Sequence, residues 1–166
     1  MKYIWYEQTV PDGMEVRQVH GVLLTHDGRV LIRIKNGQAR LTGGHPEPGE
    51  SWSDTLDREA LEESSVVCGE MAYLGYQVPE SEDYAQVRLA AMIEEILPAQ
   101  PDPDRSNNWI YGRELVPIAE AQKRLEVSFG ENGGRMLDLA VKIAEGHGWF
   151  TFKNSELEVL NSESKD

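Results

Sequence analysis

Residues 43–66 of the chain read GGHPEPGESWSDTLDREALEESSV. The first part is rich in glycine and proline, the residues that most often interrupt helices and strands, and we interpret it as a loop. Ser51, followed three positions later by Asp54, resembles a capping box, in a version weaker than usual because the acid is Asp rather than Glu. We therefore expect a helix that begins at Ser51 and runs to about Ser64.

This helix would place three carboxylates close together. Each residue of a helix turns by roughly 100°, so Glu59, Glu62 and Glu63 fall within an arc of about 100°. Carboxylates this close repel one another when they are partly removed from water. Arg58 can offset one of them, and a hard divalent cation such as Mg²⁺ can bind several through oxygen. An isolated acidic run is usually a solvated face, so the wider spacing of the segment has to decide between the two interpretations.

Outward from this segment, the pattern predicts strands on both sides. A hairpin is expected before it, with strands Val16–Leu24 and Val30–Lys35 joined by a turn at Asp27 and Gly28. A short strand, Ala39–Leu41, would lead into the loop. After the helix we expect strands at about Met71–Val78 and Ala85–Ile96, and a short edge strand at Trp109–Tyr111.

The C-terminal part of the chain predicts helices. Pro117 suits the first position of a helix through Leu125. A second, amphipathic helix carries apolar residues at helical spacing from Met136 to Ile143 and ends at Gly146. Strands flanked by helices predict an α/β domain, and the hairpin requires a mixed rather than an all-parallel β-sheet.

Composition limits the classes of function. The length of 166 residues suggests one domain, which we place at 1–153, followed by an acidic tail, 154–166, that we expect to be flexible. The net charge of −13 disfavours nucleic acid polymers and anionic membranes as partners. Cys68 is the single cysteine, and no stretch has the length or character of a signal peptide or a membrane span. We therefore expect a cytoplasmic protein.

The spacing of the segment is specific. It fits G-x₅-E-x₇-R-E-U-x-E-E, where U is apolar, and a chance match anywhere in the chain is on the order of one in a hundred thousand from average residue usage. The matching positions are Gly44, Glu50, Arg58, Glu59, Ala60, Glu62 and Glu63. The segment thus resembles the Nudix box. Ser65 stands where that family usually has glycine, and Thr42 where many members have proline.

The resemblance implies an α/β/α sandwich and a pyrophosphohydrolase that needs Mg²⁺, with Mn²⁺ as a possible substitute. It implies that Glu59, Glu62 and Glu63 bind metal, that Gly44 offers its carbonyl to the metal, and that Glu50 supports the loop or a further metal. The catalytic residues would be Glu59, as the candidate base for water, and Arg58, which would hold Glu59 in place. The implied substrate is small and nucleotide-like, a nucleoside diphosphate linked to another group. Homodimers are common in the family.

Several assignments stay open. Arg33, Lys35 and Arg40 precede the glycine loop and are candidates for contacts with phosphate, although strand charges that only solubilise are as common. His45 lies in the loop and is a weaker candidate for substrate binding. The family often takes one more acid from a later loop, and Glu94, Glu95, Asp102 and Asp104 are all possible here.

Three other functions compete with hydrolysis. A catalytically silent Nudix-like sensor would bind a nucleotide without cutting it, but it would normally have lost carboxylates of the box. An isomerase of isoprenoid diphosphates shares the fold and would need a reactive residue such as Cys68 in the pocket. An acidic structural protein would carry the same helix as a solvated face.

Overall fold

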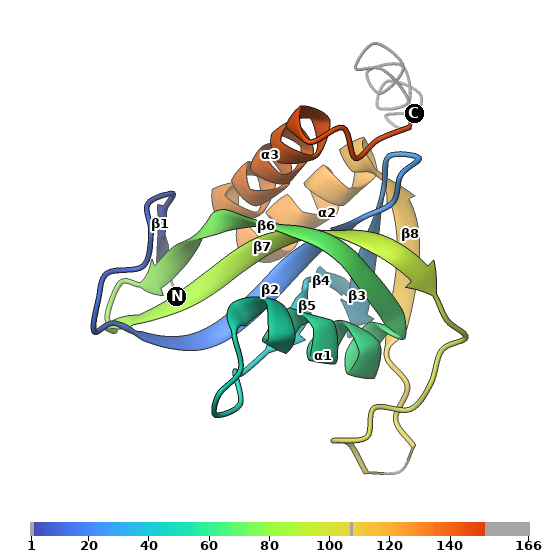
Figure 1. Cartoon of the computed structure of the whole chain (residues 1–166), viewed down its shortest axis with the longest axis horizontal. Coiled ribbons are helices and arrows are strands. Elements are labelled where there is room, and N and C mark those ends of the chain that lie inside the picture. The colour runs from blue at the N-terminus through green and yellow to red at the C-terminus, as the bar shows by residue number, and fades with distance from the viewer. Residues whose placement is uncertain (1, 107, 152–166) are drawn as a thin grey trace.

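The computed structural model describes residues 2–106 and 108–151, and its centre is a mixed, twisted β-sheet between two layers of helix (Figure 1). Within the described residues the sheet has eight strands, in the order β1-β6-β7-β2-β3-β4, with β5 paired to β2 and β8 paired to β3. The strands are β1 (Tyr3–Tyr6), β2 (Glu15–Leu24), β3 (Arg29–Lys35), β4 (Gln38–Arg40), β5 (Thr42–Gly44), β6 (Val66–Pro79), β7 (Tyr84–Ile96) and β8 (Gly112–Pro117).

The helices are α1 (Trp52–Ser64), α2 (Ile118–Phe129) and α3 (Glu131–Gly146). Helix α1 covers one face of the sheet, and α2 and α3 cover the other (Figure 1). Each face has its own apolar cluster. Leu56 and Ala60 of α1 pack on residues such as Val19 and Leu31, and Leu125 of α2 is part of the second cluster. This is the α/β/α sandwich that the sequence predicts.

The sheet is mixed because β2 has two kinds of neighbour. It forms the predicted hairpin with β3, in which Leu24 pairs with Val30, and it also runs parallel to β7. The preceding residues of β2 pair with β5 instead of β3, so that His20 lies opposite Gly43. The glycine loop is thereby anchored to the middle of the sheet.

The predicted edge strand at Trp109–Tyr111 is wrong. These residues belong to the connection after β7, and the strand is Gly112–Pro117, which pairs with β3 from Ile34 back to Arg29. Pro117 is the N-cap of α2 rather than its first residue, and α2 extends past Leu125 to Phe129. The predicted acidic tail, 154–166, lies outside the described residues.

The N-terminal strand β1 is a sheet edge that pairs with β6, and Tyr6 stacks on Tyr76 at a centroid distance of 5.0 Å. Ile4 and Tyr6 stay partly exposed there and could contact a second copy of the chain, and homodimerisation remains a prediction.

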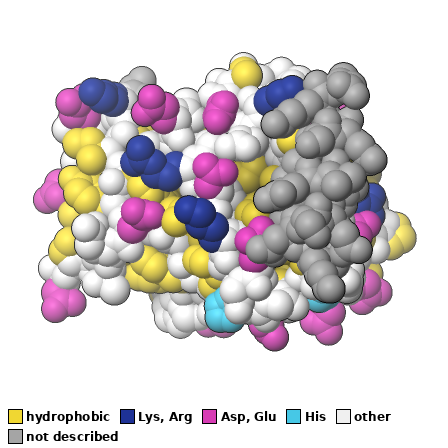
Figure 2. Space-filling model, turned by 90° about the horizontal axis from the view of Figure 1, so that it is seen from above, with side chains coloured by type: hydrophobic (Ala, Val, Ile, Leu, Met, Phe, Trp, Pro, Cys, Tyr) yellow, Lys and Arg dark blue, Asp and Glu magenta, His cyan; other side chains and the backbone are white. Residues whose placement is uncertain are grey.

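Within the described residues, no helix is both long enough and apolar enough to cross a membrane. Seen from above the orientation of Figure 1, basic side chains stand singly among acidic and apolar ones (Figure 2).

Candidate functional site

Helix α1 begins with the capping box that the sequence predicts. The Asp54 N–H donates to the Ser51 hydroxyl, and the Ser51 N–H donates to the Asp54 carboxylate, both at 3.1 Å. Leu56 and Ala60 are fully buried against the sheet. Because these two positions fix the rotation of the helix, Arg58 and the three predicted glutamates lie along the margin between the core and solvent.

Arg58 is the centre of a network of hydrogen bonds. Its Nε and Nη2 donate to the two Glu50 oxygens at 2.8 and 3.0 Å, and its Nη1 donates to Glu59 at 3.0 Å and to Glu62 at 3.3 Å. Nη2 also donates to the carbonyl of His45 at 3.1 Å. The bonds to Glu50 are the main reason that the pKa of Arg58 is raised. A single guanidinium thus joins the loop to two of the metal-ligand candidates.

Glu50 is fully engaged in the loop. Besides Arg58, the backbone N–H of Glu47 and the hydroxyl of Thr55 donate to its Oε1. The Arg58 bonds, and next the Glu47 N–H, lower the pKa of Glu50 to about 2. Of the two roles expected for Glu50, these contacts favour support of the loop over binding of a further metal.

The two glycines of the loop lie against the carboxylates of α1. A Cβ at Gly44 would meet the Glu59 carboxylate, so a larger residue there would displace that side chain. The backbone N–H of Gly43 donates to Glu63 at 3.0 Å. On its other side, Glu63 faces Arg33, whose Nε lies 3.4 Å from Oε2. The glycine pair therefore places the backbone of the loop directly against the carboxylates of Glu59 and Glu63.

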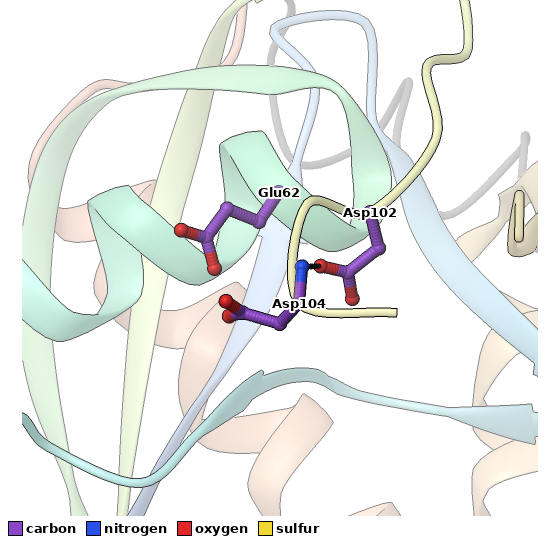
Figure 3. Close-up of side chains that lie close together, drawn as sticks. All are labelled: Glu62, Asp102 and Asp104. Atoms are coloured by element: carbon purple, nitrogen blue, oxygen red, sulfur yellow. Dashed lines mark hydrogen bonds between the residues drawn. The ribbon is translucent and has the colours of Figure 1, made fainter. Parts of the chain in front are cut away.

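Two further carboxylates reach the same place from the connection between β7 and β8. Oxygens of Glu62, Asp102 and Asp104 lie within 4.8 Å of one another (Figure 3). Asp102 is buried and accepts the N–H of Asp104 at 2.9 Å. Glu94 and Glu95, the other acids that the sequence left open, are exposed on β7. Of the four acids, the structure therefore brings Asp102 and Asp104 to Glu62 as candidate metal ligands.

The donor set fits a hard divalent cation. Burial raises the pKa of Glu62 to about 7, and the neighbouring Asp104 adds to this effect. Burial also raises the pKa of Glu63 to about 7, against the opposing charge of Arg33. Burial is likewise the main cause of the raised pKa of Glu59. Carboxylates that hold their protons more tightly than usual lack compensating positive charge, and Mg²⁺ or Mn²⁺ bound through oxygen would supply it.

Several contacts hold the acidic connection in place. The Arg113 guanidinium donates to the carbonyls of Ser64 and Leu97, both at 2.6 Å. The Ser65 hydroxyl accepts the N–H of Gln100 at 2.9 Å. Nearer β8, the Tyr111 hydroxyl accepts from Nε of Arg105 at 2.9 Å. The end of α1 and the start of the acidic connection are therefore tied to each other.

The four predicted substrate contacts do not share one place. Arg33 is buried and lies with its guanidinium 4.5 Å from the centre of the Tyr111 ring, and Arg40 lies opposite it on β4. Both line a cavity on the sheet. Lys35 is exposed at the end of β3 and does not line this cavity. His45 is exposed in the loop, with Nδ1 2.7 Å from the carbonyl of Arg17.

Sequence reasoning missed the buried polar residues of that cavity. His20 on β2 pairs in register with Arg88 on β7, and Gln86 lies on the same face as Arg88. All three line the cavity, and both β7 residues are buried. The sequence does contain a signal, since Gln86 and Arg88 alternate within an otherwise apolar run, and two polar residues on one face of such a strand indicate a polar cavity as well as a strand.

A glycine loop against clustered carboxylates in an α/β/α sandwich is a site of the class that can bind a divalent metal through oxygen. Within that class, the model of the NUDIX domain matches residues 12–132, so this chain belongs to the Nudix family and is a Nudix-type hydrolase. The family cleaves pyrophosphate bonds and typically requires divalent metal. Comparison with curated proteins found no match.

Solved structures share the fold. The Bacillus subtilis pyrophosphohydrolase BsRppH, solved as a point mutant, is 16% identical with a TM-score of 0.61, over 89% of this chain and 92% of that one. A protein of Chromobacterium violaceum assigned to the nudix hydrolase family is 20% identical with a TM-score of 0.53, over 94% of each chain. A structure from work on MutT of Aliivibrio salmonicida and Vibrio cholerae is 16% identical with a TM-score of 0.54, over 72% and 92%.

Proposed function

We propose that this protein hydrolyses a diphosphate bond in a small nucleoside-diphosphate-linked molecule, by attack of water on phosphorus, with Mg²⁺ as the cofactor and Mn²⁺ as a substitute. One observation carries the proposal. Asp102 and Asp104 come from a connection about forty residues after α1, and their oxygens nevertheless meet those of Glu62 within 4.8 Å. A merely solvated acidic helix would have no reason to attract two more acids, because like charges repel.

Glu62, Asp102 and Asp104 would hold the metal, together with Glu59 and Glu63 of the same helix and the carbonyl of Gly44. A divalent cation bound there neutralises phosphate oxygens and lowers the pKa of a bound water.

Glu59 is our candidate base. Arg58 holds its Oε1 at 3.0 Å, which leaves Oε2 to accept the proton of the attacking water. Its pKa is raised chiefly by burial, and a carboxylate with a raised pKa is a stronger base.

The alternative functions make different demands. Burial raises the pKa of the Cys68 thiol to about 12, so the thiol stays protonated at neutral pH and does not favour isomerase chemistry. A silent sensor would bind nucleotide at the same place without turnover.

A screen of nucleoside-diphosphate-linked compounds with Mg²⁺ or Mn²⁺ tests the proposal, with a Glu62→Gln, Glu63→Gln double variant run beside the wild type. We expect metal-dependent cleavage by the wild type and a loss of at least about a hundredfold in the variant, because metal neutralisation of phosphate is worth several kcal/mol. Binding of nucleotide without turnover would show a sensor. Equal metal affinity in both proteins would leave the helix as a solvated face and overturn the proposal.

A further inference from the structure

A cavity of about 300 Å³ lies on the sheet beside the carboxylate cluster, and its lining is unusually cationic. Three arginines contribute to it, Arg33 from β3, Arg40 from β4 and Arg88 from β7. Ser128 and Phe129, at the C-terminal end of α2, also line it. The net charge of the chain is −13, so three arginines around one cavity run against the overall composition.

The cavity contains hydrogen-bonding atoms without partners. Among the described residues, four buried side-chain nitrogen or oxygen atoms lack a hydrogen-bond partner, and three of them belong to residues that line this cavity: Nε of Arg33, Nε of Arg88 and Oγ of Ser128. All three can donate. Nε of Arg33 faces the Glu63 carboxylate at 3.4 Å, whereas Nε of Arg88 and Oγ of Ser128 face no acceptor. Because an unpaired buried donor is costly, these two donors beside Arg33 indicate that a ligand rich in acceptor oxygens completes them.

Arg88 is the most telling of these residues. Its side chain is buried, with 3% of the residue exposed, and the described ion pairs give it no carboxylate partner. Its Nη1 donates to the Val87 carbonyl at 3.2 Å and lies 3.4 Å from Nδ1 of His20, and its Nη2 lies 3.3 Å from Gln86. Burial lowers its pKa to about 10, so it remains charged at neutral pH.

The remaining groups around the cavity do not cancel this charge. Burial, and next Arg88, lower the pKa of His20 well below its ordinary value, so His20 is neutral and can accept from Arg88 at Nδ1. Glu63 lies 3.4 Å from Arg33 at the margin that faces the metal-ligand candidates. The interior of the cavity is therefore positive, and a buried positive charge without a partner requires an anion.

We propose that this cavity binds a second anionic group of the substrate, a phosphate monoester separate from the diphosphate that is cleaved. The inference rests on the proposed function. Arg33 joins the two parts, since it faces Glu63 and also lines the cavity. A volume of about 300 Å³ is at the lower end of the usual range for ligand sites, so it suits a phosphate with part of its sugar rather than a whole nucleotide.

Matched substrates test the proposal through turnover. NAD and NADP share one diphosphate and differ by one phosphate, and so do dephospho-coenzyme A and coenzyme A. With Mg²⁺ present, we expect kcat/KM to be at least about tenfold higher for the phosphorylated member of one or both pairs, chiefly through KM, because a charge-assisted hydrogen bond to a buried arginine changes affinity by about tenfold or more. Arg88→Gln should abolish the preference and leave kcat on the unphosphorylated member nearly unchanged.

Arg135→Gln is the matched control, since Arg135 is exposed on α3, and it should keep the preference. We expect Arg88→Gln to melt at or above the temperature of the wild type without ligand, because it removes a buried charge that lacks a carboxylate. A purely structural arginine would instead lower it. If Arg88→Gln does not fold, Ser128→Ala, which removes the other unpaired donor of the cavity, takes its place.

Binding of inorganic phosphate to the metal-free protein in EDTA gives a readout that needs no turnover. Phosphate should raise the melting temperature of the wild type and of Arg135→Gln but not of Arg88→Gln. Equal binding by all three proteins, or no binding, would overturn the proposal. Phosphate binding without any preference between matched substrates would assign the cavity to a free anion and overturn its place in the substrate. Failure to cleave any diphosphate, with phosphate binding as expected, would instead contradict the proposed hydrolysis.

Discussion

Ser65 follows α1 with a left-handed backbone, φ 53° and ψ 47°. This conformation costs a residue with a Cβ about 1 kcal/mol, which is why glycine is usual there. The structure shows a compensating contact, because the Ser65 hydroxyl accepts the N–H of Gln100 at 2.9 Å. Gln100 lies two residues before Asp102. The serine therefore anchors the start of the segment that carries two of the metal-ligand candidates.

Two substitutions separate these effects. Ser65→Gly removes both the backbone cost and the hydroxyl, whereas Ser65→Ala removes only the hydroxyl. We expect both to weaken Mn²⁺ binding by the same few-fold factor, because each frees the start of the acidic connection, and one hydrogen bond is worth about 1 kcal/mol. Ser65→Ala should be less stable than Ser65→Gly by about 1 kcal/mol, because it keeps the left-handed Cβ.

Calorimetric titration with Mn²⁺ and thermal melts of the metal-free proteins would measure the two effects. Ser81→Gly, at an exposed turn, is the control for the added freedom of the unfolded chain. Unchanged Mn²⁺ affinity in both Ser65 variants would mean that the hydroxyl does not position the acidic connection.

At the scale of elements, α1 and the connection after β7 bring acids together that are costly without metal. The pKa of Glu62 and that of Glu63 are about 7, above the ordinary 4.5, with burial as the main cause. A carboxyl whose pKa is higher in the folded chain than in the unfolded chain opposes folding once it is ionised. In the metal-free protein these groups should therefore lower stability as pH rises from about 4.5 through 7, and the loss should persist above pH 7.

The Glu62→Gln, Glu63→Gln variant should lack this loss of stability. At pH 8 and without metal, we expect it to melt several degrees above the wild type, whereas at pH 4 the two proteins should melt alike. Mg²⁺ at pH 8 should raise the melting temperature of the wild type but not that of the Glu62→Gln, Glu63→Gln variant. Glu80→Gln, Glu82→Gln makes the same change in net charge at exposed positions and should behave as the wild type does. Equal melting temperatures of all three proteins at pH 8 would contradict the inference that ionised Glu62 and Glu63 destabilise the metal-free fold.

Local patterns predicted the elements that carry their own signals. The capping box at Ser51 and the turn at Gly28 identified α1 and the β2–β3 hairpin, and the box spacing identified Arg58 and its glutamates. The pairing of β8 with β3 joins Gly112 to Ile34, far apart in the sequence, and nothing local to Trp109 or Tyr111 indicates which residues find that partner. The choice of Asp102 and Asp104 over Glu94 and Glu95 depends on that same long connection. The meeting of His20 with Arg88 depends on another non-local contact, the parallel pairing of β2 with β7.

At the scale of the whole molecule, the chain is strongly acidic, whereas the cavity lined by Arg33, Arg40 and Arg88 is basic. The chain carries 29 acidic and 16 basic side chains, and a field of that sign repels an anionic substrate at a distance. In our proposal, metal bound by the α1 cluster and the arginines of the cavity would attract the substrate at short range. These contributions differ in range, so salt distinguishes them. Exposed charges are screened beyond a distance that falls from about 30 Å at 0.01 M to about 8 Å at 0.15 M salt, whereas buried contacts are screened much less.

We therefore expect kcat/KM for an anionic diphosphate to rise a few-fold as sodium chloride increases from about 10 to 150 mM at saturating free Mg²⁺, because salt removes the long-range repulsion before it weakens the buried contacts. Initial rates at low substrate concentration would measure this, with free Mg²⁺ held constant so that chelation does not vary. The rise should be steeper for the substrate with the larger negative charge. If kcat/KM instead falls steadily with salt, the metal and the arginines govern the approach of substrate as well as its binding, and the acidic surface has no part in selecting it.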